Sequence, residues 1–208
     1  MLRDILNYDS VSRETIDDVF DYIDLLKAWN IRVALISKLD MDFMLDEHIA
    51  DSYHLAKVVS GYSKILDLGS GNGLPGVIIA LINRDKSVVL TDKNFKKSVF
   101  LREVKRKLNL DLMEVDSISV TSDVLNVHKP DVIVAKAFAS VDRILDICGD
   151  YCFQGNIDLI LSKSMSWSEE IKLVEKKWYF NLQIISNPYI NRFVLVKMSN
   201  IKRNEEVS

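Results

Sequence analysis

The chain has 208 residues, of which 48% are hydrophobic and 27% charged, and its formal net charge is −3. This composition is typical of one folded domain and excludes a uniformly basic coat for nucleic acid. No apolar run approaches the ~20 residues of a membrane helix, and the first residues lack the apolar core of a signal peptide. Two cysteines do not make a disulfide framework. We therefore expect a cytoplasmic protein with no membrane partner.

The first sixty residues predict helices. Apolar side chains recur at helical spacing over residues 12–30, and a similar spacing continues over 33–60. Gly61 and Ser63 interrupt this pattern. We expect a helical extension over residues 1–60, a sheet domain over 61–198 and a polar tail over 199–208.

Strand and helix signals alternate after Gly61. Strands are predicted at 64–68, 87–91, 112–115, 132–135, 157–161, 182–186 and 192–198, and helices at 75–82, 94–108, 141–152 and 168–178, with a polar connection at 117–129. This alternation predicts a Rossmann-like α/β fold with a mostly parallel, seven-stranded sheet covered on both faces. The last two strands are close enough to form a hairpin, which would give the sheet an antiparallel edge strand.

A glycine-dense turn follows the first predicted sheet strand, in the run ILDLGSGNGLPG from Ile65 to Gly76. Glycine lets the backbone approach a ligand, and the start of the next helix directs free N–H groups at it. Two patterns overlap here. Gly71-x-Gly73-x-x-Gly76 fits a dinucleotide site, whereas Asp67-x-Gly69-x-Gly71-x-Gly73 fits class I methyltransferases that use S-adenosylmethionine. The second is favoured, because Asp67 can reach the donor's amino group but would repel a pyrophosphate.

Asp92 ends the second sheet strand and is the expected partner of a ribose. The alternative is that Asp92 caps the following helix. Residues 93–110 carry seven cations and one anion, and the apolar residues of this segment share the other face of the predicted helix. These cations face either an RNA backbone or only solvent, and the sequence leaves both interpretations open.

These features together resemble the bacterial ribosomal RNA small subunit methyltransferase G family, also called glucose-inhibited division protein B. The similarity runs from about Leu25 to Lys197. Its most specific stretch is Asp67 to Gly76, in which Leu74-Pro75-Gly76 after the glycines is a mark of the family. The other matching segments are His48-Ile49-Ala50-Asp51-Ser52, Asp92 with Lys96 to Leu101, Ala137-Phe138-Ala139-Ser140, Lys163 and Arg192.

The resemblance implies methylation of guanine N7 in the decoding-region loop of 16S ribosomal RNA, with S-adenosylmethionine as the donor. The implied partner is the small ribosomal subunit, and a monomer is expected. Carried over from the family, the donor-binding positions are Gly69, Leu74, Ile118, Ser119 and Lys136. We add four residues from the loop and second strand, Asp67, Gly71, Gly73 and Asp92.

Some positions depart from the family pattern. Lys136 stands where the family has arginine, and Ser117-Ile118-Ser119 replaces Arg-Val-Glu. These departures keep one alternative open, an RNA-binding module with a residual donor pocket. A second alternative is a nicotinamide-dependent oxidoreductase that uses Gly71, Gly73 and Gly76, for which no proton donor is visible.

Guanine N7 carries a lone pair and no proton, so its methylation needs no general base. Catalysis then depends on holding N7 and the methyl group in line. Lys136 and Lys163 are expected to contact phosphate, guanine O6 or the donor carboxylate, and Arg192 is a further candidate substrate contact. Phe138 either stacks on the target base or packs in the core. No metal-ligand spacing is present.

Overall fold

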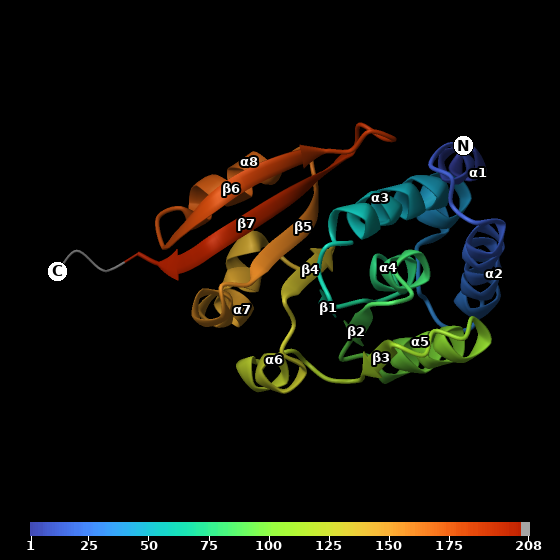
Figure 1. The fold of residues 1–208 in the computed structure, drawn as a ribbon, viewed down its shortest axis with the longest axis horizontal. Helices are drawn as coiled ribbons and strands as arrows, with labels where there is room; N and C mark the ends of the chain where they lie inside the picture. The colour runs from blue at the N-terminus through green and yellow to red at the C-terminus, as the bar shows by residue number, and fades with distance from the viewer. Residues whose placement is uncertain (205–208) are drawn as a thin grey trace.

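The computed structural model describes residues 1–204, apart from the side chains of residues 42 and 43. A twisted sheet lies at the centre, with helices on both faces (Figure 1). Its strands are β1 (Lys64–Leu68), β2 (Ser87–Thr91), β3 (Met113–Asp116), β4 (Val132–Lys136), β5 (Asp158–Ser164), β6 (Trp178–Ser186) and β7 (Phe193–Arg203). The described helices are α1 (Leu2–Tyr8), α2 (Arg13–Asn30), the π-helix η1 (Asp40–Met44), α3 (Leu45–Val58), α4 (Gly76–Ile82), α5 (Phe95–Lys107), α6 (Ser122–His128), α7 (Val141–Gly155) and α8 (Trp167–Val174).

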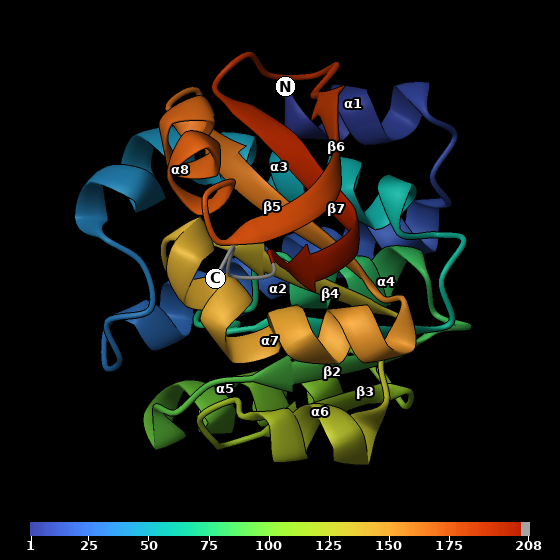
Figure 2. The same cartoon turned by 90° about the vertical axis from the view of Figure 1, so that its left-hand side faces the viewer.

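The strand order is β3-β2-β1-β4-β5-β7-β6. Strands β1 to β5 are parallel, and β7 runs antiparallel to both of its neighbours. The predicted fold class and the predicted final hairpin are thus confirmed. The antiparallel strand β7 lies one place in from the edge, because β6 pairs on its outer side. Figure 2 shows this long hairpin twisting above α7, which packs against β7.

Alternate strand residues point into two hydrophobic cores, as the period-two geometry of a strand requires. On β1 and β4, Ile65 and Val132 lie in the core shared with α1 to α5, whereas Leu66 and Ile133 lie in the core shared with α6 to α8. The amino-terminal helices therefore pack into the same core as α4 and α5. This packing brings the segment before α3 to the carboxyl ends of the strands.

The structure corrects several predicted boundaries. The helix predicted at 168–178 ends at Val174, and Trp178 instead begins β6. Its buried indole fills the space beside Gly149, where a Cβ would overlap the ring. Strand β7 continues to Arg203 because it pairs with β6, so residues 199–203 of the expected polar tail are strand. Residues 205–208 of that tail lie outside the described residues. The connection at 117–129 contains α6.

Within the described residues, none of the helices is long and apolar enough to cross a membrane. Likewise, the side chains that the structure describes include no cluster of three or more suited to a metal ion.

Candidate functional site

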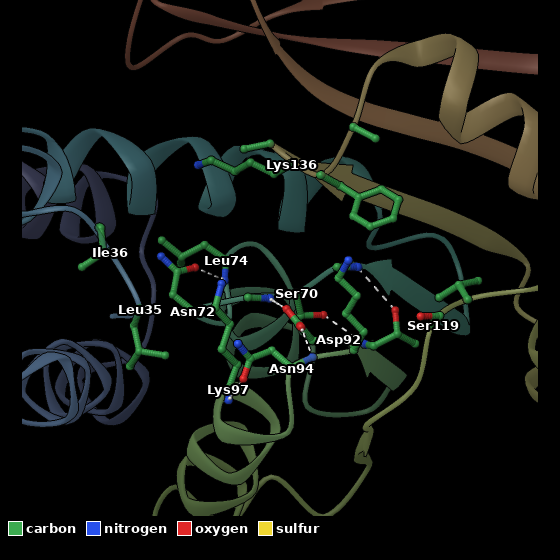
Figure 3. Close-up of a pocket in the computed structure, with 18 of the residues that line it drawn as sticks. Leu35, Ile36, Ser70, Asn72, Leu74, Asp92, Asn94, Lys97, Ser119 and Lys136 are labelled. Atoms are coloured by element: carbon green, nitrogen blue, oxygen red, sulfur yellow. Dashed lines mark hydrogen bonds between the residues drawn. The ribbon is translucent and has the colours of Figure 1, made fainter. Parts of the chain in front are cut away.

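A pocket of about 710 Å³ opens at the carboxyl ends of β1, β2 and β4. Strand order reverses between β1 and β4, and ligands of open α/β sheets bind at such a switch point. The pocket (Figure 3) is lined by the loops that follow the first four strands and by the segment before α3. The lining residues discussed below are His48, Gly69, Gly71, Leu74, Asp92, Lys93, Lys97, Ile118, Ser119, Lys136, Ala137, Phe138, Ala139 and Arg143.

The glycine loop has positive φ angles at Gly69, Gly71 and Gly73, of 68°, 55° and 100°. A Cβ at Gly71 would meet only ordinary contacts, 3.8 Å from Lys97 Nζ and 3.9 Å from Asp92 Oδ2, so this glycine faces the pocket. A Cβ at Gly73 would lie 2.7 Å from Val77 Cγ2. Gly73 therefore faces the core, and the structure does not place it on the pocket wall.

Asp92 lies at the pocket wall, as its predicted role requires. Its Oδ2 accepts a hydrogen bond from the Gly71 N–H at 2.9 Å, and its Oδ1 accepts from the Asn94 N–H at 2.7 Å. Asn94, not Asp92, is the N-cap of α5, so the alternative capping role of Asp92 is wrong. Each carboxylate oxygen retains a lone pair for a further donor, such as a ribose hydroxyl.

Asp67 is completely buried behind the glycine loop and does not line the pocket. Its Oδ2 accepts from the Gly76 N–H at 3.0 Å, while Oδ1 has no hydrogen-bond partner in the described part of the chain. Burial raises the pKa of this carboxyl to about 7. A Cβ at Gly76 would lie 2.6 Å from Asp67 Oδ2, so only glycine permits this approach. The structure thus places Asp67 where it anchors the start of α4.

Tyr22 of α2 supports the glycine loop from the other side, and the sequence analysis missed it. Its hydroxyl donates to the Asn72 carbonyl at 2.8 Å, and its side chain is fully buried. Burial raises the pKa of this phenol, so it remains a donor. The available signal was its place on the apolar face of α2, between Val19 and Leu26. A buried tyrosine on such a face needs a hydrogen-bond acceptor.

Lys136 lines the pocket, but its ammonium group is directed toward α3 (Figure 3). Its Nζ lies 2.9 Å from Asp51 Oδ2 and donates to the His48 carbonyl at 2.7 Å. Asp51 is fully buried and also accepts from Ser162 Oγ at 2.6 Å. Burial lowers the pKa of Lys136 against the opposing effect of Asp51. These acceptors hold the ammonium form, so its charge is neutralised inside the protein.

The wall after β4 is formed by Phe138 and its neighbours. The Phe138 ring rests on Gly69, where a Cβ would overlap it, and 38% of the residue stays exposed. One part of the Phe138 ring is therefore packed against the glycine loop, and another part stays accessible to a ligand. Each of the two predicted interpretations holds for one part of the side chain. Ile118 and Ser119 form the wall after β3, and Ile118 is 39% exposed.

Two predicted substrate contacts lie outside the pocket lining. Lys163 forms an ion pair with Glu170 at 2.8 Å and donates to the Ala139 carbonyl at 3.1 Å. Arg192 is more than half exposed and lies 3.5 Å from Glu47. The structure therefore brings together most of the predicted donor residues, but it does not bring Asp67, Gly73, Lys163 or Arg192 to the pocket wall.

Three cations at the pocket rim have no acidic partner among the described side chains. Lys93, Lys97 and Arg143 line the pocket, and the ion pairs of the described residues include none of them. They contrast with Lys136, whose charge Asp51 balances. The rim is therefore suited to an anionic partner.

The glycine loop, the carboxylate at the end of β2 and the Rossmann-like sheet define the class of S-adenosylmethionine-dependent methyltransferases. Solved structures agree on the fold. A methyltransferase from Geobacter sulfurreducens superposes with a TM-score of 0.60 over 95% of each chain at 16% identity. A variant of MtNAS in complex with S-adenosylmethionine gives a TM-score of 0.59 over 90% of this chain and 72% of that chain, at 12% identity.

The sequence comparisons identify the family. The model described as GidB, rRNA small subunit methyltransferase G, matches residues 15–189. Relatives named ribosomal RNA small subunit methyltransferase G include one from Bartonella henselae, 31% identical over 93% of this chain and 90% of its own. Another, from Francisella philomiragia, is 31% identical over 86% of this chain and 85% of its own.

This chain belongs to the ribosomal RNA small subunit methyltransferase G family. Membership of this family confirms the predicted family. It also confirms the predicted enzyme class, a 16S ribosomal RNA (guanine-N7) methyltransferase that uses S-adenosylmethionine. The oxidoreductase and the RNA-binding module without catalysis are not favoured.

Proposed function

We propose that the 710 Å³ pocket holds S-adenosylmethionine and that this chain methylates guanine N7 in the decoding-region loop of 16S ribosomal RNA. The observation that carries the proposal is the meeting of Gly71 and Asp92 at the switch point of the sheet in a member of this family. When bound, S-adenosylmethionine supplies an electrophilic methyl group on its sulfonium.

The residues at the pocket wall fit this donor. Asp92 offers two carboxylate oxygens to the ribose hydroxyls, and such charge-assisted hydrogen bonds are strong. Gly69 and Gly71 let the backbone approach the methionine part. Leu74 and the half-exposed Ile118 give apolar surface for the adenine, beside the polar Ser119.

The guanine side of the pocket needs positioning and a suitable electrostatic environment. N7 becomes positively charged as the methyl group is transferred, so an unpaired cation beside it would slow the reaction. Asp51 neutralises Lys136 at 2.9 Å, which removes that penalty. The exposed part of Phe138 provides an aromatic surface for the unstacked guanine. No proton has to be removed from N7, so no general base is required.

The RNA backbone approaches the rim formed by Lys93, Lys97 and Arg143, where its phosphates serve as anionic partners of these cations. The sequence left open whether the basic run of residues 93–110 faces RNA or solvent. In this proposal, the amino-terminal end of the run contacts the RNA backbone. We infer that the chain acts as a monomer on the small ribosomal subunit in the cytoplasm.

Mass spectrometry of 16S ribosomal RNA from cells with and without this chain tests the proposal. We expect one 7-methylguanosine in the decoding-region loop that is lost with the chain and restored by it. Asp92→Asn should restore it poorly, because one acceptor for the ribose becomes a donor, whereas the exposed Asp111→Asn should restore it fully. An unchanged methylation pattern in cells lacking the chain would refute the proposed reaction.

A further inference from the structure

The loop at residues 137–140, between β4 and α7, carries three pocket-lining residues in a conformation that its own sequence does not favour. Ala137, Phe138 and Ala139 line the pocket, and Ala137 has a φ of 51°. A left-handed conformation is costly for a residue with a Cβ and persists only when the surroundings enforce it. Contacts from outside the loop must therefore hold it.

Lys163 and Glu170 supply these contacts. Lys163 Nζ donates to the Ala139 carbonyl at 3.1 Å, and Glu170 Oε2 accepts from the Val141 N–H at 2.8 Å. The two side chains are also bonded to each other, with Lys163 Nζ at 3.1 Å and 2.8 Å from the two Glu170 oxygens. One carboxylate on α8 therefore holds the loop on both sides of Ser140.

The position of the loop matters to the pocket because of Phe138. Its ring lies directly on Gly69, so a shift of the loop would move the aromatic surface relative to the glycine loop. Glu170 itself does not line the pocket. Its influence on the pocket passes through Lys163 and the backbone of the loop.

We propose that Glu170 is a positioning residue, which fixes the guanine-facing loop through Lys163 and the Val141 N–H without touching either substrate. This inference rests on the proposed function, since that function assigns the loop to the guanine side. It also gives Lys163 a defined role: its ammonium group holds the loop and is not available to RNA.

The test compares E170A with E169A, because Glu169 is exposed on the same first turn of α8. Among the described residues, the Glu169 side chain has no hydrogen-bond partner. With purified small subunits and labelled donor, we expect E170A to lower kcat by about 10- to 100-fold, as small misplacements of reacting groups do. Its Kd for S-adenosylhomocysteine should stay within about threefold of wild type. E169A should match wild type in both.

A charge swap, K163E with E170K, separates the loop contacts from the ion pair. The swapped pair keeps its attraction, but residue 170 can no longer accept from Val141 and residue 163 can no longer donate to Ala139. We therefore expect a Tm close to wild type with kcat still low. If kcat returns to wild type, the ion pair alone matters and the inference is wrong. Should E170A fail to fold, the charge swap, which removes both loop contacts, takes its place in the comparison with E169A.

Hydrogen exchange of residues 137–143 gives a readout that does not depend on activity. Exchange should be faster in E170A than in E169A. Equal exchange and equal kcat in these two variants would overturn the inference while wild type remained active. An inactive wild type would instead refute the proposed function, and exchange alone would then decide whether Glu170 holds the loop.

Discussion

The glycine loop after β1 and the loop after β4 line the same pocket but are held in different ways. The glycine loop is fixed mainly by itself and by the adjacent end of β2. Its Ser70 N–H donates to the Thr91 carbonyl at 2.8 Å, and its Gly71 N–H donates to Asp92. The loop after β4 is held by Lys163 of β5 and Glu170 of α8. Asp51 of α3 holds Lys136, at the end of β4 just before this loop.

Under the proposed function, this difference separates the donor side of the reaction from the guanine side. The donor side is built from a short run of sequence with a recognisable pattern, and its backbone conformation depends on glycine. The guanine side is built from ordinary residues that become effective only through remote partners. Substitutions on the donor side should therefore act on donor affinity, and those on the guanine side on stability and turnover.

The largest effect is expected from Lys136→Met, which leaves the Asp51 carboxylate buried without its counter-ion. The free energy of unfolding should fall by about 3–5 kcal/mol, as for other broken buried pairs, as measured by urea denaturation. K136M combined with D51N should recover most of this loss. The exposed pair of Lys177 and Asp142 is the control, and K177M should cost under about 1 kcal/mol. Equal costs for K136M and K177M would contradict the assigned role of the buried pair.

Gly71→Val breaks the donor side instead. A β-branched residue at a φ of 55° is strained, and its methyl groups would enter the pocket beside Asp92. Affinity for S-adenosylhomocysteine should fall by about 100-fold or more, equal to about 2.7 kcal/mol, as measured by calorimetry. Gly61→Val is the matched control, since a Cβ there meets nothing within 4 Å. If G71V binds S-adenosylhomocysteine with unchanged affinity, the donor does not bind at this loop.

Asp67→Asn tests the donor side through the pH dependence of the free energy of unfolding. The buried Asp67 carboxyl has a pKa raised to about 7, so between pH 4 and 7 the folded state binds more protons than the unfolded state. Ionisation of this group therefore lowers wild-type stability as pH rises through that window, and the loss is complete above pH 7. D67N should remove this component and be more stable at pH 8 by on the order of 2–4 kcal/mol.

Urea denaturation at pH 5 and pH 8 measures this effect, with the exposed Asp111→Asn as control. The stability gain of D67N over wild type should be larger at pH 8 than at pH 5. A constant difference at both values would show that Asp67 does not titrate in this window.

The smallest effect is expected at the rim. K93A combined with K97A should weaken binding to 16S ribosomal RNA and reduce the slope of log K against log salt by about 0.7–0.9 for each lost phosphate contact, as measured by filter binding. The exposed Lys172 and Lys176 lie on and after α8, away from α5 (Figure 1), so K172A with K176A matches the change in net charge. Identical slopes for the two double variants would place the RNA elsewhere.

Much of the fold could be predicted from the sequence because its signals are local. The strand at 87–91 has the predicted bounds, and α4 and α5 lie within one residue of theirs. Predictions failed where tertiary packing overrode local spacing. Local spacing placed Trp178 at the end of a helix, but its contact with Gly149 places it in β6. The last residues of β7 were predicted as a tail, but their pairing with β6 makes them strand.

The same division holds in the site. Gly71 and Asp92 were predictable, because a glycine loop and a carboxylate at the next strand end form a pattern along the chain. The burial of Asp67 and the contact of Tyr22 with Asn72 were not, since each depends on which face of an element meets its neighbour. The commitment of Lys163 to Glu170 depends on two elements that meet only in the folded chain.

By itself, the sequence determined the α/β class, the donor loop and the membership of a methyltransferase family, because glycine conformations and strand-helix alternation are encoded over a few residues. The tertiary structure alone decided which charges reach the pocket. Lys136 and Lys163 are as cationic in sequence as Lys93 and Lys97, yet only the folded chain places Asp51 and Glu170 beside the first two. The pairing of charges depends on distance in space, which residue order does not record.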